Sequence, residues 1–416
     1  MVSERRVVVT GMGVLCCLGQ GMEMVWPRLL NGDIGYDLIT KFDAEGYASK
    51  VAGEVLNFNP EQYLNPKDIK KTDPFIQFAI ASAQMAVDNS GLDLDSVNRD
   101  RMGVNIGSGI GGINEICEQQ TILQSRGPRR VSPFFIPNSI ANLASGHVSM
   151  RFGARGPNSS VCTACATGTH AVGDSFEYIR RGAADIMIAG GAEASVMPLA
   201  VAGFCSMRAL TTRNDDPKAA SRPFDKGRDG FIISEGSACV ILEEETHARA
   251  RGAHIYCELL GYGMSGDAYH LSHPSPGGEG AARAIRAALE SAGINPEQVD
   301  YVNAHGTSTP LNDKYESMAL RTVFGSKVDT LAVSSTKSMV GHLLGAAGAF
   351  EFAVVAKSIE ESKIHGTMNY DEPDEECDLA DYVPNESRDL PVRYAISNSF
   401  GFGGTNGCLV AGRYDG

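Results

Sequence analysis

The sequence predicts an α/β fold made of two similar halves, stacked as five layers in the order helix, sheet, helix, sheet, helix. Two observations predict it. Strand-like and helix-like segments alternate along the chain, which is typical of a mainly parallel sheet covered on both faces. The order of these segments in residues 1–252 is then repeated in residues 253–416. No low-complexity linker separates the halves, so we expect them to share one interface and act as one unit.

Four pairs of matched segments make up the repeat. Each half is expected to open with an apolar strand that runs into a Gly-x-Gly turn, followed by a strand that ends in small residues. A β-prone stretch then leads into a helix rich in glycine and alanine, with apolar residues at helical spacing, and a terminal strand closes the half. The pairs are residues 6–13 and 256–263, 104–109 and 301–306, 161–179 and 333–359, and 236–242 and 407–411.

Composition excludes several classes of protein. The 416 residues are 43% hydrophobic, which is enough for a large core, and the formal charge of −14 argues against a general nucleic-acid or anionic-membrane surface. The ten cysteines follow no disulfide-framework spacing, so a cytoplasmic location is expected. The apolar run at residues 7–18 is interrupted by Thr10, Gly11 and Gly13 and fits a strand better than a signal peptide. The sequence contains no uninterrupted stretch of about 20 apolar residues, so no membrane-spanning segment is expected.

Two short motifs resemble sites of other chemistries. Residues 107–112 satisfy G-x-G-x-x-G, but dinucleotide binding also needs an acidic residue about 20 positions later, where the chain has Arg129 and Arg130. Cys162-x-x-Cys165 could be a redox pair or half of a zinc site, but no second cysteine pair completes a zinc site. For residues 107–112 we favour a loop in which another backbone approaches closely. For Cys165 we favour a role other than redox or zinc binding.

One cysteine and two histidines indicate covalent thioester chemistry. Cys165 stands where a β-prone stretch gives way to a helix, so free N–H groups and the helix dipole would stabilise its thiolate. A buried, inert cysteine is the alternative, but the flanking Thr-Ala-Cys-Ala-Thr-Gly is small and polar. His305 follows a strand and His342 precedes a small-residue helix, positions suited to catalysis. We therefore expect Cys165 to be a nucleophile assisted by these two imidazoles.

Charged residues and a glycine loop accompany the histidines. Lys337 and Glu351 lie five residues before and nine residues after His342, and could form an ion pair that orients an imidazole; a plain helix-end salt bridge is not exclusive of this. The loop at residues 400–407 contains two phenylalanines among glycines. We expect it to supply an N–H group to an oxyanion hole and aromatic rings to gate a pocket, with a simple glycine turn as the alternative.

These motifs resemble those of the elongating β-ketoacyl-acyl-carrier-protein synthases, in the thiolase superfamily. The resemblance covers residues 6–411 and is carried by Thr163–His170, Asn303–Asp313, Ser335–His342 and Asn398–Asn406, while residues 107–112 and 132–137 resemble the type II enzymes. It implies a duplicated thiolase-like αβαβα fold and decarboxylative Claisen condensation of an acyl-enzyme thioester with malonyl-acyl carrier protein, in fatty-acid elongation. The Cys-His-His set differs from the Cys-His-Asn set of the initiating synthases.

The resemblance also implies a role for individual residues. Cys165 would carry the acyl chain, His305 and His342 would promote decarboxylation, and Lys337 and Glu351 would organise them. The remaining implied roles are an oxyanion hole from the N–H groups of Cys165 and Phe402, phosphopantetheine binding by Thr307 and Thr309, gating of the acyl pocket by Ile110, lining by Phe135 of a partner subunit and by Phe400, a second gating loop at Asp267 and His270, and a structural monovalent cation bordered by Asn303, Glu351 and Asn398.

Partners follow from the same resemblance. An acidic acyl carrier protein would dock on the basic residues Lys67, Lys70, Lys71, Arg129, Arg130 and Arg208 and would bring the phosphopantetheine, so no resident cofactor is expected; a solvated surface is the alternative for these residues. A homodimer is implied. Two other functions stay open: a polyketide ketosynthase subunit, and a non-catalytic chain-length partner, against which the presence of Cys165 argues. A degradative thiolase would need a second catalytic cysteine, and Cys408 is not in such a setting.

Overall fold

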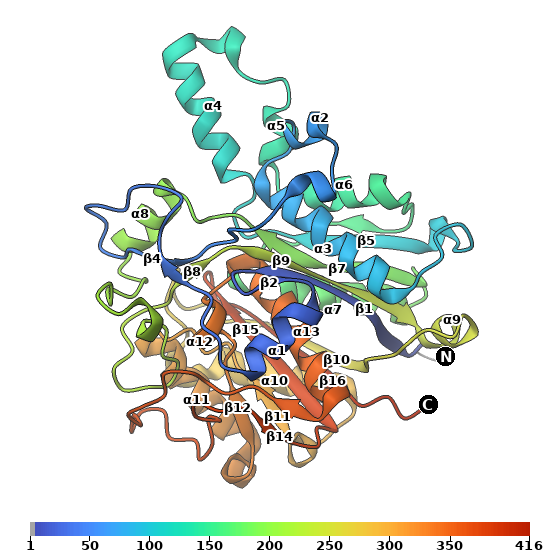
Figure 1. Ribbon diagram of the computed structural model, residues 1–416. Helices are drawn as coiled ribbons and strands as arrows, with labels where there is room; N and C mark the ends of the chain where they lie inside the picture. The colour runs from blue at the N-terminus through green and yellow to red at the C-terminus, as the bar shows by residue number, and fades with distance from the viewer. Residues whose placement is uncertain (1–4) are drawn as a thin grey trace.

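The computed structural model describes residues 5–416 and consists of two α/β halves joined edge to edge (Figure 1). One long sheet runs through both. Its first half contains, from the outer edge inward, the strands β6 (Asn158–Ser159), β5 (Met102–Gly107), β7 (Ile186–Glu193), β9 (Gly236–Glu244) and β1 (Val7–Cys16). Its second half continues with β10 (Cys257–Gly266), β16 (Thr405–Gly412), β15 (Tyr394–Gly401), β11 (Tyr301–Asn303) and β12 (Ala332–Ser334).

Helices cover both faces and produce the five layers that the sequence predicts. The helices α3 (Pro74–Ser90) and α6 (Leu143–Phe152) lie on the outer face of the first half, and α10 (Glu279–Ala292) and α11 (Pro310–Phe324) lie on the outer face of the second. Between the two halves of the sheet lie α7 (Thr167–Arg180) and α13 (Ala347–Glu361), packed against each other. The thiolase-like αβαβα fold is therefore confirmed, with α3, β5, α6, β6, α7, β7 and β9 following β1 in the order that recurs from β10.

The sheet differs from the expectation in two ways. It is mixed rather than mainly parallel: β5 pairs in parallel with β6 and β7, and β11 with β12 and β15, whereas the inner strands run antiparallel. The halves are also not separate sheets. Val7 pairs with Leu259, and Val9 with Cys257, so β1 and β10 join the two halves by backbone hydrogen bonds. This pairing satisfies the backbone N–H and C=O groups of β1 and β10 that would otherwise lie unpaired at the edge of each half.

The Gly-x-Gly sequences of the two opening strands lie inside the strands, so the expectation of turns there was wrong. A Cβ atom on Gly13 of β1 would come within 2.1 Å of the Ser82 carbonyl oxygen in α3. The matching Gly263 of β10 would place a Cβ atom 2.2 Å from the Ala284 carbonyl oxygen in α10. These glycines therefore permit close approach of a covering helix to its strand, a role that glycine also has inside strands.

The central helices approach each other just as closely. A Cβ atom on Gly168 would lie 2.6 Å from the Ala349 backbone nitrogen, and one on Gly348 would lie 2.6 Å from the Thr169 backbone nitrogen. Around this contact the apolar side chains of both helices are buried, including Phe176 of α7. Small residues thus let the two helices meet with their N-termini close together.

Insertions decorate the first half, and the fold projects outward at one of them. The helix α4 (Ile113–Arg126) stands out from the body, with α5 (Phe135–Ser139) and α2 (Pro66–Ile69) near its base (Figure 1). Smaller elements outside the repeat are, in the first half, α1 (Met22–Leu30), α8 (Pro198–Ser206), α9 (Glu245–Ala250) and the short strands β2 (Gly19–Gln20), β3 (Asp37–Leu38), β4 (Val51–Gly53) and β8 (Ile233–Ser234). In the second half they are α12 (Lys337–Val340), β13 (Lys363–Ile364) and β14 (Arg388–Asp389).

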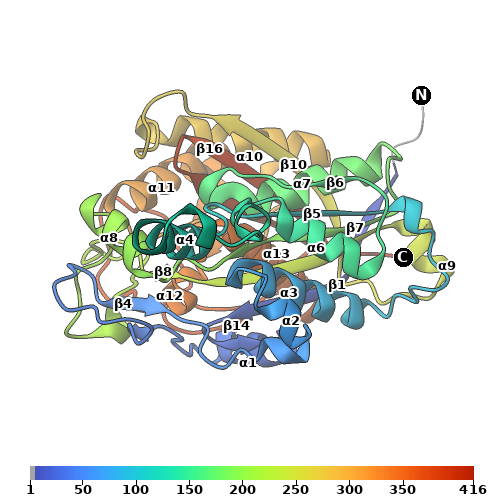
Figure 2. The ribbon, with the colours of Figure 1, turned by 90° about the horizontal axis from the view of Figure 1, so that it is seen from above.

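The described part of the chain begins and ends at the same side of the molecule. Arg6 lies over the Tyr414 ring at 5.2 Å, and Figure 2 places the C-terminus beside α9, away from α8 and α4. Among residues 5–416, no helix is long and apolar enough to cross a membrane. All ten cysteines are free in the structure. The cytoplasmic location inferred from the cysteine pattern stays a prediction.

Replacing Gly263 with alanine is expected to destabilise the protein by about 1–3 kcal/mol, because the new methyl group must displace the α10 backbone. Gly203, inside α8, is the matched control: a Cβ atom there meets nothing within 4 Å. Gly203→Ala should be neutral or stabilising by about 0.5–1 kcal/mol through helix propensity. Chemical denaturation of both variants measures the change in unfolding free energy. Equal stability of the two variants would contradict the close-packing role of Gly263.

Candidate active site

Cys165 lies in a tight turn that joins a loop to α7. The residues Ala164–Ala166 form a 3₁₀ turn, and Ala164 has a φ of +49°, a strained conformation for a residue other than glycine. This turn aims the Cys165 side chain into a cavity instead of along the helix. The thiol is hydrogen-bonded by the backbone N–H of Phe402, and its own N–H also faces it. The two N–H groups predicted to form an oxyanion hole therefore converge on the sulfur.

Burial, and not the helix terminus, dominates the charge state of this thiol. It raises the pKa of Cys165 to about 11, and the Glu193 carboxylate also acts in that direction. The Phe402 N–H and the Lys337 ammonium lower the pKa but do not offset burial. The expected thiolate stabilisation is thus present as an interaction but not as a net effect. Cys165 is a protonated thiol at neutral pH.

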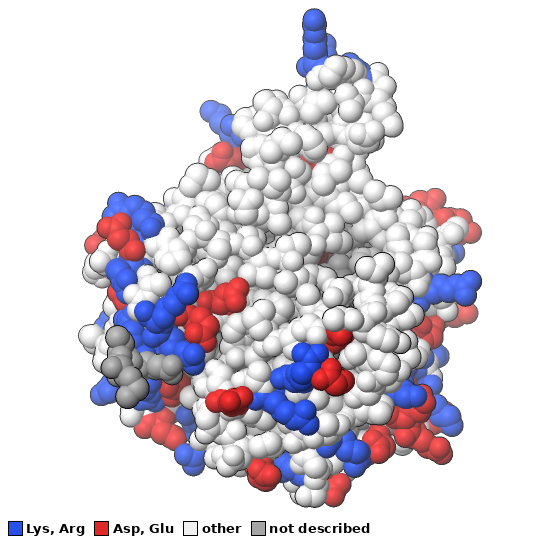
Figure 3. Space-filling model, turned by 180° about the vertical axis from the view of Figure 1, so that it is seen from behind, with Lys and Arg blue, Asp and Glu red and all other residues white. Residues whose placement is uncertain are grey.

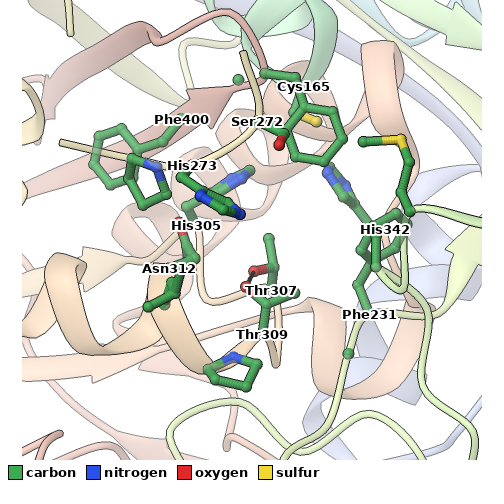
Figure 4. Close-up of a pocket in the computed structure, with 18 of the residues that line it drawn as sticks. Cys165, Phe231, Ser272, His273, His305, Thr307, Thr309, Asn312, His342 and Phe400 are labelled. Atoms are coloured by element: carbon green, nitrogen blue, oxygen red, sulfur yellow. Dashed lines mark hydrogen bonds between the residues drawn. The ribbon is translucent and has the colours of Figure 1, made fainter. Parts of the chain in front are cut away.

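The two histidines come from the second half and meet under the nucleophile. His305 follows β11, and His342 follows α12, in the segment that leads to α13. Their ring centroids are 5.3 Å apart, with the ring planes at 85° to each other. Figure 4 shows both imidazoles and Cys165 around one cavity. The structure therefore brings together the three residues that the sequence singled out.

Hydrogen bonds fix which nitrogen of each imidazole carries the proton. The Leu344 backbone N–H donates to Nδ1 of His342 over 3.3 Å, so the proton of the neutral ring is on Nε2. The Lys337 ammonium lies 3.4 Å from Nδ1 of His305, and an ammonium only donates, so this ring also carries its proton on Nε2. Nε2 of His342 has no hydrogen-bond partner among residues 5–416. It is thus free to donate to a ligand in the cavity.

Both rings are neutral at physiological pH. Burial holds the pKa of His305 and of His342 well below the usual histidine range, and the Lys337 charge lowers both further. Lys337 is itself buried and makes an ion pair with Glu351, and it donates to the His305 carbonyl oxygen over 2.7 Å. The ion pair predicted from spacing alone is present, and its ammonium adds to the effect of burial in lowering the pKa of both imidazoles.

The cavity has a volume of about 300 Å³ and extends from Cys165 to the molecular surface. Thr307 and Thr309 line it farther from the thiol than the histidines do, with their hydroxyl oxygens 2.8 Å apart (Figure 4). Phe400 packs against His305 at 5.7 Å between ring centroids, and Phe402 also lines the space. A cavity of this size has room for a small-molecule group, and the two threonine hydroxyls offer it hydrogen bonds.

Some expected residues do not line this cavity in the single chain. Ile110 is 37% exposed, and neither it nor Phe135 is among the lining residues. Asp267 does line the cavity, but His270 does not; His273 takes that place, with His270 stacked on it at 4.3 Å. Ser272 and His273 donate backbone N–H groups to the His270 ring. His270 therefore shapes the loop that presents His273.

Sequence reasoning missed several residues that complete the site. Phe231 meets the His342 ring edge-on at 5.3 Å, and Phe204 links Phe231 to Phe402 by ring contacts. Glu316 accepts the backbone N–H groups of His305 and Gly306, and so holds the His305 turn in place. The two phenylalanines have no motif that marks them. Glu316 could have been found, because it lies on α11 three residues beyond the last acidic residue of the His305 motif.

Buried oxygen atoms near the ion pair fit a hard cation. Oδ1 of Asn303, Oδ1 of Asn398 and Oε2 of Glu351 are buried without a hydrogen-bond partner among the described residues. Asn303 pairs with Ser397 across β11 and β15, which places Asn398 on the neighbouring strand. Amide and carboxylate oxygens are the ligands that such cations prefer. The donor set implied by the resemblance is therefore consistent with the structure.

Comparison with known proteins identifies the family. The family model described as beta-ketoacyl synthase, N-terminal domain, matches residues 4–248, and the one described as beta-ketoacyl synthase, C-terminal domain, matches residues 256–371. The chain belongs to the β-ketoacyl synthase family. A 3-oxoacyl-[acyl-carrier-protein] synthase 2 of Coxiella burnetii is 51% identical over 410 residues, which cover 99% of each chain. A protein of the same name from Staphylococcus aureus is 49% identical over the full length of both chains.

Solved structures of other β-ketoacyl synthases have the same fold. A beta-ketoacyl synthase from Burkholderia phymatum superposes with a TM-score of 0.92 at 34% identity, covering 99% of this chain and all of that one. A type II PKS ketosynthase solved in complex with its acyl-carrier protein superposes with a TM-score of 0.91 at 35% identity over the same shares. The duplicated architecture of this β-ketoacyl synthase is thus that of its family over the whole chain.

Alkylation of Cys165 is expected to accelerate about tenfold per pH unit between pH 7 and 10, because its pKa of about 11 leaves the thiol protonated across that range. The thiolate, which is the reactive form, increases until the pH passes the pKa. Peptide mass spectrometry after iodoacetamide treatment measures the rate at Cys165, with Cys165→Ala as the blank. A rate that levels off below pH 8 would instead indicate a thiolate stabilised by the helix terminus.

Proposed function

We propose that the protein catalyses the decarboxylative Claisen condensation of an acyl-enzyme thioester with malonyl-acyl carrier protein, which gives β-ketoacyl-acyl carrier protein and CO2 in fatty-acid elongation. The observation that carries this proposal is the pair of neutral imidazoles, 5.3 Å apart, facing the cavity beside Cys165, the only cysteine that lines it among the described residues. Two neutral N–H donors next to a thiol suit a reaction that develops enolate charge, and the curated relatives carry the name of such a synthase.

The first half-reaction is acyl transfer to Cys165. Sγ attacks the thioester carbonyl of the incoming acyl carrier protein, and the carbon–sulfur bond to phosphopantetheine breaks. The Cys165 proton leaves with the departing thiol, so charge balances. Negative charge that develops on the carbonyl oxygen is held by the N–H groups of Cys165 and Phe402, and one such donor is typically worth about 3–4 kcal/mol. The positive charge of Lys337 stabilises the Cys165 thiolate whenever it forms.

The second half-reaction uses the histidines. The bond between the malonyl carboxylate and Cα breaks, CO2 leaves, and the electron pair remains as an enolate. The Nε2–H groups of His305 and His342 donate to its oxygen, because each Nδ1 is already engaged as an acceptor. The Cα carbon then attacks the acyl thioester, and the Cys165 sulfur leaves as a thiolate that regains a proton. Neutral rings suit this step, since they donate hydrogen bonds to the enolate oxygen but are too weakly acidic to protonate the enolate.

The alternative functions are less well supported. A type II PKS ketosynthase and the ishigamide ketosynthase share the fold at 35% and 37% identity, whereas the curated 3-oxoacyl-[acyl-carrier-protein] synthase 2 relatives reach 49–51%. A chain-length partner without catalytic activity has no use for the thiol, the imidazole pair and the buried Lys337–Glu351 ion pair that this chain retains together. Fatty-acid elongation therefore remains the function that the site supports best.

An acyl carrier protein is the proposed partner, and the basic residues are its proposed docking surface. Lys67, Lys70 and Arg129 are exposed, and Lys71 lies over the Phe134 ring at 5.1 Å, which joins the α2 cluster to the segment after α4. Arg208 lies at the cavity itself. Figure 3 shows Lys and Arg side chains at the tip of the projection above a surface with few charges. The carrier would bring the phosphopantetheine past Thr307 and Thr309.

A homodimer is proposed from the same face. Several large apolar side chains on and beside the projection are exposed, namely Ile116, Leu123, Phe134, Ile136, Ile140 and Met150. The strand β6 ends the sheet near them with an unpaired edge. Exposed apolar patches of this kind mark protein–protein interfaces. A partner subunit seated here would cover Ile110, which is otherwise exposed, and could bring its Phe135 to the acyl pocket.

A bound monovalent cation is proposed at Asn303, Glu351 and Asn398. When bound, it would neutralise the carboxylate oxygen that Lys337 does not reach. Burial raises the pKa of Glu351 to about 7, and Lys337 opposes this shift. The three residues would hold the cation through their unpartnered oxygens and so keep Glu351 ionised beside Lys337. Beyond the phosphopantetheine of the carrier, no other cofactor is proposed.

Replacing His305 or His342 with alanine is expected to lower malonyl decarboxylation by at least about a hundredfold, because each ring supplies one N–H donor to the enolate. Acylation of Cys165 should continue, since the oxyanion hole is built from other residues. Release of labelled CO2 measures decarboxylation, and intact-protein mass spectrometry measures acylation. Cys165→Ala is the control that loses the adduct. Unchanged CO2 release in both histidine variants would exclude the proposed role.

Charge reversal at Lys67, Lys70 and Arg129 is expected to raise KM for carrier-bound substrate about tenfold or more at low salt, with little effect on small pantetheine thioesters. The wild-type advantage should shrink as ionic strength rises, because exposed charges are screened over about 8 Å at physiological salt. Reversal at Lys327, Lys363 and Arg413, which do not line the cavity, changes net charge equally and serves as the control. Similar losses for both triple variants would place docking elsewhere.

A further inference from the structure

Glu193 is a buried carboxylate that the proposed mechanism does not use. It ends β7 and is fully buried. Its Oε2 accepts the backbone N–H groups of Gly109, at 2.8 Å, and Gly345, at 3.0 Å. Its Oε1 accepts the Ile110 N–H at 3.2 Å and the hydroxyls of Ser108 and Ser195. Burial raises the pKa of this carboxyl, but the five donors, three of them N–H groups that can only donate, oppose that shift and complement the ionised form.

Four of these donors belong to two loops with different roles in the reaction, and the fifth, Ser195, follows Glu193 in the chain. One is the Ser108–Ile110 segment after β5, which carries the predicted gate of the acyl pocket. The other is the turn between His342 and α13, in which the Leu344 N–H fixes the His342 ring and the next N–H, from Gly345, goes to Glu193. The carboxylate thus connects the gate to the turn that sets the proton position on a catalytic imidazole.

The two loops touch at the carboxylate and leave no room for side chains. A Cβ atom on Gly345 would lie 2.4 Å from the Gly109 nitrogen and 2.7 Å from Oε2 of Glu193. A Cβ atom on Gly109 would lie 2.8 Å from that same oxygen. The N–H groups of two loops therefore converge on one carboxylate. The arrangement resembles the backbone nests in which proteins bind anions, but here the anion is the Glu193 side chain.

The repeat gives this site a counterpart. The turn Leu344–Ala346 precedes α13 as Ala164–Ala166 precedes α7, and Leu344 has a φ of +50° where Ala164 has +49°. Gly345 therefore occupies the position that corresponds to Cys165. Its N–H matches an oxyanion-hole donor of the first half, but here it holds a permanent carboxylate instead of a transient oxyanion.

We propose that Glu193 is a positioning residue that locks the acyl gate at Ile110 to the His342 turn, so that movement of the gate by an acyl chain is transmitted to the decarboxylating histidine. This proposal rests on the proposed function for its catalytic consequence, whereas the clamp itself is a property of the fold. In Glu193→Gln the shape is kept, but one oxygen becomes an NH2 group that faces N–H donors. In either amide orientation this group faces at least one N–H donor, and the hydrogen bonds that remain are no longer charge-assisted, so both loops would be held less tightly.

Hydrogen exchange on the full-length protein measures the clamp independently of activity. In Glu193→Gln, the amides of residues 108–112 and 343–347 should both exchange about tenfold faster or more, since their anchor is shared. Residues 303–308 should be unaffected. The matched control is Glu316→Gln, because Glu316 also binds two backbone N–H groups while fully buried, but on the His305 turn. It should loosen residues 303–308 and leave the two Glu193 loops unchanged.

Steady-state condensation with acyl chains of graded length measures the coupling. The ratio of kcat/KM for long and short chains should change about fivefold or more in Glu193→Gln, because only chains that reach the gate feel its release. Ser108→Ala, which removes one donor on the gate side, should change the ratio in the same direction by a smaller factor and substitutes if Glu193→Gln does not fold. Faster exchange in one loop only, or an unchanged ratio with both loops loosened, would overturn the proposal. If both loops loosen in Glu193→Gln but the wild-type protein condenses no acyl chain, the clamp is confirmed and the proposed function is refuted.

Discussion

The whole structure depends on the close approach of α7 and α13. Each helix begins directly after a turn that carries active-site groups, Cys165 before the first and His342 before the second. Because Gly168 and Gly348 let the helix backbones touch, the two N-termini lie side by side between the halves of the sheet. A larger residue at either glycine would separate the halves and, with them, the nucleophile from the imidazole. Packing at the centre of the fold therefore sets the distance over which the chemistry occurs.

Burial then sets the protonation state of the thiol and of both imidazoles. It disfavours charge on the thiol and on both imidazoles, and the nearby Lys337 ammonium lowers the pKa of both rings further. The result is a site whose groups act as hydrogen-bond donors before they act as acids or bases. Such preorganised donors need little rearrangement when an oxyanion or enolate forms.

The chemistry was predictable from sequence because it resides in short, contiguous motifs, and the duplicated order of elements was predictable because hydrophobic patterns repeat. Other features were not predictable for physical reasons. Gly13 and Gly263 suggested turns, since a sequence cannot distinguish a glycine that bends a strand from one that admits a helix. The pKa of Cys165 depends on burial by distant segments, which outweighs the local helix terminus. Phe231, Glu316 and Glu193 reach the site only through tertiary contacts, so no local pattern marks them.

Gly345 has a consequence for how this duplicated protein can evolve. Its backbone lies so close to Gly109 that any side chain at that position collides with the neighbouring loop. A single substitution to cysteine could therefore not give the second half a nucleophile, because a second change in the Gly109 loop and a third at Glu193 would be needed together. The two halves have kept the same backbone turn, yet the path from one to the other passes through variants that fit neither role. For this reason, no single substitution at Gly345 moves the nucleophile from the first half to the second.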